Sequence, residues 1–172
     1  ADVDHAGLLS LFDAVYMSGS CYENFAAERR GEPNFREQNP LHAPYCALSK
    51  VISEYEPPDL DRCHVLGRKQ DGATLSPIGT QNFGPWEFEF YEGNGGHVRG
   101  ETVIVCRELK LVFSGDIYVN IKGFSQEQQE FNAIAPLLMT GVDSDPAEAR
   151  RCRDLLRETY AGYLFCPGHG TV

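Results

Sequence analysis

Hydrophobic residues in the first third of the chain recur mostly at helical spacing. The segment 6–13 (AGLLSLFD) follows this pattern, and the short apolar run 14–18 after it predicts an extended strand. Residues 21–30 and 45–55 predict two further helices. The segment between them, 31–44, is rich in proline, asparagine and charge, which is typical of a surface loop or lid.

From about residue 62 the pattern changes to that of β-strands. Runs of β-branched and aromatic residues predict strands at 62–67, 86–90, 102–106, 111–115 and 163–166. The polar sequence RELK between the third and fourth of these runs predicts a hairpin. Helices are expected near 125–139 and over 145–160, the second with Ser144 or Asp145 as its N-terminal cap. Interspersed helices and strands without an internal repeat indicate one layered domain of the α/β or α+β class.

The composition limits the classes of function. The 172 residues, 42% of them hydrophobic and 23% charged, are sufficient for one domain with a hydrophobic core. The net charge of −10 would repel nucleic acid, and no apolar run reaches the roughly 20 residues that span a bilayer. We therefore expect neither as a partner. The six cysteines form no CxxC pair and are predicted to be reduced, mostly buried thiols, which favours a cytoplasmic location.

Candidate metal ligands are concentrated in four short segments, each at the expected end of a strand. They are ADVDHAG (1–7), GGHVRGET (95–102), FSGDIY (113–118) and CPGHGT (166–171). Histidine, aspartate and glutamate bind divalent zinc, iron and manganese, and glycines beside them allow the backbone to turn sharply and approach closely. One histidine beside a glycine carries little information, but four such segments in one chain indicate a metal site.

The order of these motifs, D-x-D-H, then G-H-x-x-G-E-T, then S-G-D, then P-G-H-G, resembles the metallo-β-lactamase superfamily over essentially the whole chain. In that family the first motif is H-x-H-x-D-H. Its last two positions match Asp4 and His5, and its second histidine position is occupied by Asp2. The first histidine would precede Ala1. The resemblance implies that residues 1–172 are a fragment of a four-layer αβ/βα sandwich. The N-terminal strands would be missing, so that the first sheet is incomplete. Whether the C-terminal end is also missing stays open.

The later motifs supply the remaining ligands that the resemblance implies. His97 matches the ligand of the family's G-H-T-P-G segment, with VRG in place of TPG. Asp116 matches the aspartate that bridges two metals, and His169 matches the histidine of the late P-G-H-G loop. The implied second metal site comprises Asp4, His5, His169 and the bridging Asp116, and the implied first site retains Asp2, His97 and Asp116.

The resemblance implies a metal-dependent hydrolase in which a metal-bound hydroxide attacks an ester, thioester or lactone-type bond of a small molecule. Asp4 and Asp116 would be the catalytic carboxylates, with Asp116 able to accept a proton as water attacks. One or two Zn²⁺ ions are expected, although the harder carboxylate of Asp2 would favour iron or manganese in the first site. Two alternatives stay open. One is a di-iron oxidoreductase of the flavodiiron type, and the other is a non-catalytic relative without a tightly bound metal.

Several residues near these motifs have less specific interpretations. Glu101 and Thr102 are expected to orient a metal ligand. Tyr118 would either donate a hydrogen bond to a substrate or pack under its loop. Of the two histidines outside the motifs, His42 is expected on the surface and His64 in a buried strand.

Overall fold

Two β-sheets and four α-helices make up the part of the chain described by the computed structural model, which covers residues 2–119, 125–127, 129–130 and 142–170. The first sheet is a parallel pair of strands, and the second has five strands in the order β3-β4-β5-β6-β7. The chain therefore has a mixed α+β architecture, as the sequence predicts. The elements in chain order are α1 (Val3–Ala6), the 3-10 turn η1 (Leu9–Leu11), β1 (Val15–Ser18), α2 (Gly19–Arg29), α3 (Ala43–Ile52), η2 (Leu60–Arg62), β2 (Cys63–Gly67), β3 (Leu75–Phe83), β4 (Trp86–Gly93), β5 (Thr102–Cys106), β6 (Leu111–Gly115), α5 (Pro146–Thr159) and β7 (Leu164–Pro167).

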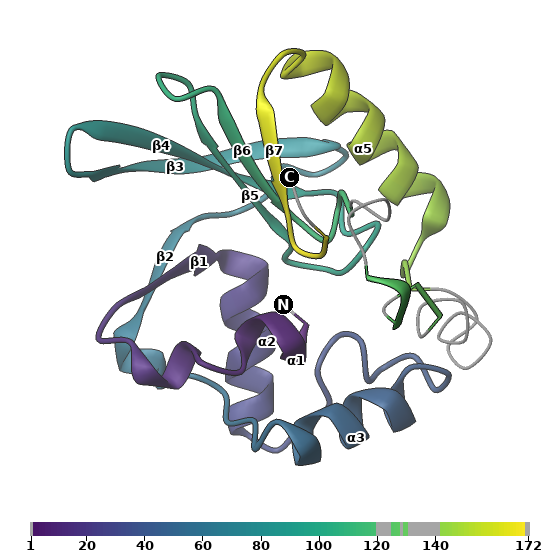
Figure 1. Ribbon diagram of the computed structural model, residues 1–172. Helices are drawn as coiled ribbons and strands as arrows, with labels where there is room; N and C mark the ends of the chain where they lie inside the picture. Colours follow the sequence, from purple (N-terminus) through teal and green to yellow (C-terminus); the bar gives the residue numbers. More distant parts are fainter. Residues whose placement is uncertain (1, 120–124, 128, 131–141, 171–172) are drawn as a thin grey trace.

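The larger sheet is covered by α5, which Figure 1 shows lying beside the strands. Strands β5 and β6 form the predicted antiparallel hairpin, with Ile104 opposite Phe113. Alternate residues of this hairpin point towards α5 because side chains of a strand alternate between its faces. Together with Ile117 and with residues of α5 and its C-terminal end, they form a buried core. Its members are Val103, Val105, Val112, Ile117, Cys152, Leu156 and Tyr160. The helix begins as predicted, with the Asp145 carboxylate accepting hydrogen bonds from the backbone N–H groups of Ala147 and Glu148.

The smaller sheet packs against α2 and has its own core. Strands β1 and β2 run parallel, and α2 follows β1 directly. The Ser18 hydroxyl caps the helix by accepting a hydrogen bond from the Cys21 backbone N–H. The buried residues between these elements are Ala6, Val15, Met17, Cys21 and Phe25. Since Ala6 belongs to α1, this core also fixes the short helix that carries the D-x-D-H motif.

Two elements differ from the sequence-based predictions, and a third prediction falls mostly outside the described residues. The predicted helix 6–13 is wrong, because α1 ends at Ala6, with Gly7 as its C-terminal cap, and only a 3-10 turn follows. Strand β3 was not predicted, because Pro77 and Gly79 interrupt its apolar pattern, and its pairing with β4 shifts register between these two residues. Most of the predicted helix 125–139 lies outside the described residues.

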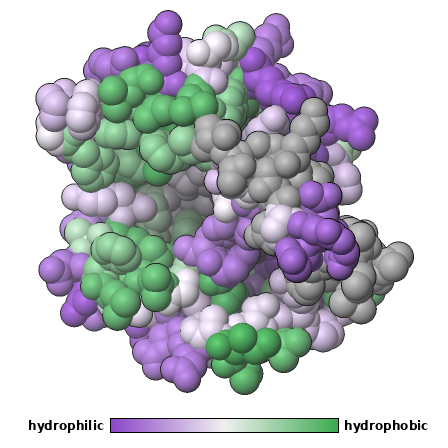
Figure 2. Space-filling model, viewed as in Figure 1, coloured by the Kyte–Doolittle hydropathy of each residue, from purple (hydrophilic) through white to green (hydrophobic). Residues whose placement is uncertain are grey.

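Hydrophobic side chains are also exposed on the smaller half of the molecule. Figure 2 shows hydrophobic surface over η1 and α3, where Leu11, Phe12, Val51 and Ile52 are more than half exposed. No described helix has both the length and the apolar character needed to cross a membrane. All six cysteines are free thiols and four of them are buried, as expected.

The arrangement of β6 and β7 determines where the later motifs lie. These two strands are parallel, so their carboxyl ends lie at the same edge of the sheet. Asp116 follows β6 and His169 follows β7, and the Gly168 backbone N–H donates to the Gly115 carbonyl at 2.8 Å. In Figure 1 the carboxyl end of β7 and the short helix α1 both lie near this edge, between the two sheets.

Candidate metal centre

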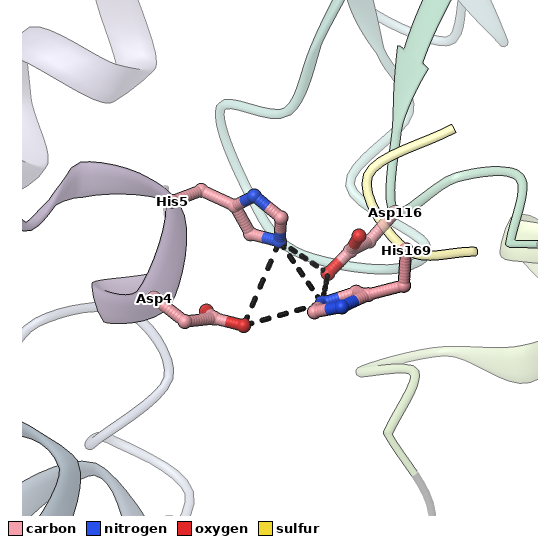
Figure 3. A group of neighbouring side chains, drawn as sticks. All are labelled: Asp4, His5, Asp116 and His169. Carbon is pink, nitrogen blue, oxygen red and sulfur yellow. Dashed lines mark hydrogen bonds and ion pairs between the residues drawn. The ribbon is translucent and has the colours of Figure 1, made fainter. Parts of the chain in front are cut away.

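Four side chains from the two ends of the chain and from the end of β6 converge at this edge. We call Asp4, His5, Asp116 and His169 the exposed cluster; each offers a ligand atom, and these atoms all lie within 4.8 Å of one another. Nε2 of His5 lies 2.9 Å from Oδ2 of Asp116 and 3.2 Å from Nε2 of His169. Oδ2 of Asp4 lies 3.3 Å from Nε2 of His169. Figure 3 shows the four polar ends pointing towards one another.

A close backbone approach makes the exposed cluster possible. Gly168 lies so near Asp116 and His5 that a Cβ atom at position 168 would overlap Oδ1 of Asp116 and come within 3.0 Å of Cε1 of His5. Any side chain at this position would push the Asp116 carboxylate or the His5 ring out of place. The glycine before the histidine in the P-G-H-G motif is therefore required by the packing of the site.

The electrostatics of the exposed cluster favour a positive charge between its side chains. The hydrogen bond to Asp116 raises the pKa of His5 above its usual value, against the opposing effect of burial. Burial would raise the pKa of Asp116, but His5 and the nearby imidazoles lower it, so this residue is a carboxylate at neutral pH. Its Oδ1 is buried and has no hydrogen-bond partner among the described residues.

A second group of side chains, the buried cluster, lies on the other side of Asp116. It consists of Asp2, Arg36, His97 and Asp143. Nε and Nη2 of Arg36 donate to the two carboxylate oxygens of Asp2, at 2.5 and 2.6 Å. Nε2 of His97 lies 3.2 Å from Oδ2 of Asp2, and its Nδ1 lies 3.0 Å from Oδ1 of Asp143. Each of the four side chains is at most 15% exposed.

The charges of the buried cluster stabilise one another. Burial would raise the pKa of Asp2, but hydrogen bonds from His97 and Arg36 hold it well below the usual range. Burial opposes the charged form of His97, yet hydrogen bonds with Asp143 and Asp2 raise its pKa to about 9. Asp143 also accepts from Arg153 at 3.2 Å. In this cluster, therefore, each carboxylate already faces positively charged or hydrogen-bonding partners.

Asp116 connects the two clusters. Its Oδ2 lies 2.9 Å from Nε2 of His5 and 3.6 Å from Nε2 of His97. The loop that carries His97 is fixed to the start of α5 by hydrogen bonds from the Ser144 and Asp145 backbone N–H groups to the His97 and Gly96 carbonyls. Asp116 therefore lies between a histidine of the exposed cluster and a histidine of the buried cluster.

All six predicted ligand residues lie in one of the two clusters or between them. Asp4, His5, Asp116 and His169 belong to the exposed cluster, and Asp116 also faces His97 of the buried cluster. Asp2 and His97 belong to the buried cluster. Their predicted role as metal ligands remains a prediction, whereas their convergence in space is observed.

Sequence reasoning missed two residues of the buried cluster, Arg36 and Asp143. Arg36 lies in the segment that was predicted as a surface loop, and no motif marks it. Asp143 takes the role of orienting a histidine that was expected of Glu101. Glu101 instead accepts hydrogen bonds from the Gly95 and Val98 backbone N–H groups and so shapes the His97 loop. A metal-binding histidine needs a hydrogen-bond partner on its second ring nitrogen, so the sequence indicated that such a partner exists. It did not indicate which residue this is.

The secondary expectations have mixed outcomes. The Tyr118 ring packs against Phe165 at a centroid distance of 5.4 Å, in agreement with the packing interpretation. The expectations for the two other histidines are wrong. His42 is buried, at 3% exposure, whereas His64 is exposed and stacks on Tyr16 at 5.2 Å.

The two clusters differ in how well they fit a metal ion. The exposed cluster has two imidazoles and two carboxylates, which form a donor set suited to zinc, iron or manganese. In the buried cluster the facing atoms of Asp2 and His97 are already in contact with Arg36.

Comparison of the sequence with protein-family models and with curated proteins finds no match. The resemblance to the metallo-β-lactamase superfamily therefore rests on the motifs.

Proposed function

We propose that this protein is a metal-dependent hydrolase of the metallo-β-lactamase superfamily whose metal centre is the exposed cluster. The observation that carries the proposal is the convergence of His5 and His169, 164 positions apart in the sequence, on the Asp116 carboxylate. Imidazole nitrogens and carboxylate oxygens are common ligands of zinc. The four-layer sandwich belongs to the same proposal, and the two observed sheets are compatible with it.

The chemistry of the donor set supports hydrolysis. A divalent cation held by these four residues would lower the pKa of a bound water and polarise a substrate carbonyl oxygen. Zn²⁺ suits two imidazoles and two carboxylates, and iron or manganese are the alternatives. Asp116 is a carboxylate at neutral pH and lies at the inner side of the cluster, where it can orient a water and accept its proton.

The exposure of the side chains indicates the direction from which a substrate arrives. The side chains of Asp4 and His169 are 53% and 42% exposed, whereas that of Asp116 is 10% exposed. A substrate would therefore approach past Asp4 and His169, with Asp116 beneath it. Since the cluster is accessible from solvent, a small molecule with an ester, thioester or lactone bond could reach it, and the exposed Asp4 carboxylate would then lie beside the bound substrate.

Substitution of the connecting aspartate tests the proposal. Asp116→Ala should reduce bound zinc, measured by mass spectrometry after gel filtration, and hydrolysis of aryl ester, thioester and lactone substrates by about tenfold or more. Asp71→Ala, which removes an exposed carboxylate from a turn outside both clusters, is the matched control and should retain both properties. Full metal content and unchanged turnover in Asp116→Ala would contradict the assignment, as would absence of metal from the unsubstituted protein.

A further inference from the structure

We infer that the Arg36 guanidinium replaces the metal ion of the first site, so that this protein binds a single metal ion, at the exposed cluster. The inference rests on the proposed function, because it concerns the number of ions that the same centre takes. It departs from the two-metal site that the sequence motifs imply, since it assigns a permanent side-chain cation to one of the two positions.

The position of Arg36 carries the inference. Asp2, His97 and Asp116 together offer ligand atoms within 4.8 Å of one another, which would be the first metal site. Nη2 of Arg36 lies among these residues, 2.6 Å from Oδ2 of Asp2 and 3.2 Å from Nε2 of His97. Nε of the same guanidinium donates a hydrogen bond to Oδ1 of Asp2. An ion bound by Asp2 and His97 would have to displace the arginine.

The charges of the buried cluster also disfavour a metal ion there. Arg36 and Asp2 form a two-pronged ion pair whose side chains are 7% and 14% exposed. Because arginine does not lose its proton in proteins, this charge is permanent. A divalent ion beside it would face like-charge repulsion within a poorly solvated site, while the carboxylate that should hold the ion is already neutralised. For Asp4 and Asp116, the ion-pair partners found among the described residues are histidines, with no lysine or arginine.

The loop around Arg36 holds the guanidinium in place. Nη1 of Arg36 donates to the Val142 carbonyl at 2.7 Å. Asn34 and Glu37 on either side of it cap one another, each backbone N–H donating to the other side chain at 2.9 and 2.8 Å. The Phe35 backbone N–H donates to the Asn24 side chain in α2 at 2.8 Å. Hydrogen bonds thus hold both the backbone around Arg36 and its guanidinium, whereas a surface arginine would be free to change its conformation.

A single ion beside a fixed guanidinium has a chemical consequence. Arginine can neutralise negative charge on Asp2 and beside Asp116, but it has no site to bind and activate a water. The reacting water must therefore belong to the exposed cluster. Asp116 would face an ion on one side and the positive groups of the buried cluster on the other, so its bridging position is retained with one metal.

Metal stoichiometry decides the inference. Purified protein is stripped with a chelator and titrated with Co²⁺, with the visible absorption followed to its end point, and bound zinc is counted in parallel. We expect one equivalent for the unsubstituted protein and a second, weaker equivalent for Arg36→Ala. Arg36→Lys should stay at one, because it retains a cation beside Asp2. Arg68→Ala, which removes an exposed arginine paired with Glu23, is the control and should also stay at one.

The outcomes separate this inference from the proposed function. Two tight equivalents in the unsubstituted protein would overturn the inference while leaving the metal centre in place, and this measurement does not depend on whether Arg36→Ala folds. One equivalent in a folded Arg36→Ala protein would also overturn it, because the arginine would then not be what excludes the second ion. No bound metal in any variant would instead refute the proposed function.

Discussion

The exposed and buried clusters, which meet at Asp116, contain similar residues but differ in the partners of their carboxylates. In the buried cluster, Asp2 is paired with Arg36 on both oxygens, and His97 has a partner on both ring nitrogens. In the exposed cluster, two imidazoles and two carboxylates meet with no lysine or arginine among them, and Oδ1 of Asp116 has no partner among the described residues. Identical ligand types in a sequence therefore do not imply identical sites, because a buried cation from elsewhere in the chain can satisfy one of them.

The comparison also indicates what each cluster contributes. A buried ion pair that is complete without an added ligand contributes to the structure, and loss of one partner is costly because the other charge stays buried. A cluster of imidazoles and carboxylates that requires an added cation contributes binding and chemistry. The buried cluster should therefore control stability, and the exposed cluster should control metal affinity.

The largest expected effect comes from Asp2→Ala compared with Asp4→Ala. Asp2→Ala leaves the Arg36 guanidinium buried without its carboxylate and should lower the free energy of unfolding of the metal-free protein by about 3–5 kcal/mol. Asp4→Ala removes an exposed carboxylate and should change that free energy by less than about 0.5 kcal/mol. Urea denaturation in the presence of a chelator measures both. Equal destabilisation by the two substitutions would show that the clusters do not differ in this way.

Metal affinity should show the reverse order for these two variants. Asp4→Ala removes a ligand and should weaken zinc binding by about tenfold or more, measured by competition with a chromophoric chelator. An Asp2→Ala protein that still folds at low temperature should retain the ion of the exposed cluster. If a folded Asp2→Ala protein loses zinc binding while Asp4→Ala retains it, the metal binds in the buried cluster, which would contradict the assignment.

A smaller effect is expected from Gly168→Ala, which changes packing without removing any ligand. The added methyl group would meet Oδ1 of Asp116 and the His5 ring, so zinc affinity should fall by about tenfold, equivalent to about 1.4 kcal/mol. Gly7→Ala is a matched control close to the same histidine. Among the described residues, the Cβ at position 7 would meet the Val3 carbonyl oxygen at an ordinary contact distance of 3.5 Å, so affinity should be unchanged. Equal affinities for the two variants would mean that the close approach at Gly168 does not shape the site.

Local sequence patterns predicted much of the fold. The hairpin of β5 and β6 follows from two β-branched runs around RELK, and α5 begins at the predicted Asp145 cap. These features depend on residues within a few positions of each other. Strand β3 was missed because its pairing with β4 overrides a local sequence that contains Pro77 and Gly79. The predicted helix 6–13 is wrong because Ala6 ends α1 and is buried against residues of β1 and α2, a contact that the apolar pattern of 6–13 does not indicate.

Some residues of the candidate site could likewise be predicted from local motifs, and others could not. The motifs located all six candidate ligands because glycine, histidine and aspartate occur there in a specific order. They did not indicate that Arg36 lies against Asp2, since this contact joins positions 34 residues apart through a loop without a pattern. Asp143 was missed for the same reason, as its contact with His97 depends on how the chain returns to the start of α5. Charge pairing between distant loops is thus what this sequence did not reveal.

The most direct test of the account is an anomalous difference map from crystals of the zinc-loaded protein, measured at the zinc absorption edge. The account predicts one peak, enclosed by Asp4, His5, Asp116 and His169, with the Arg36 guanidinium still on Asp2. A map without a peak in the exposed cluster, or with a peak at Asp2 and His97 and the arginine displaced, would contradict it.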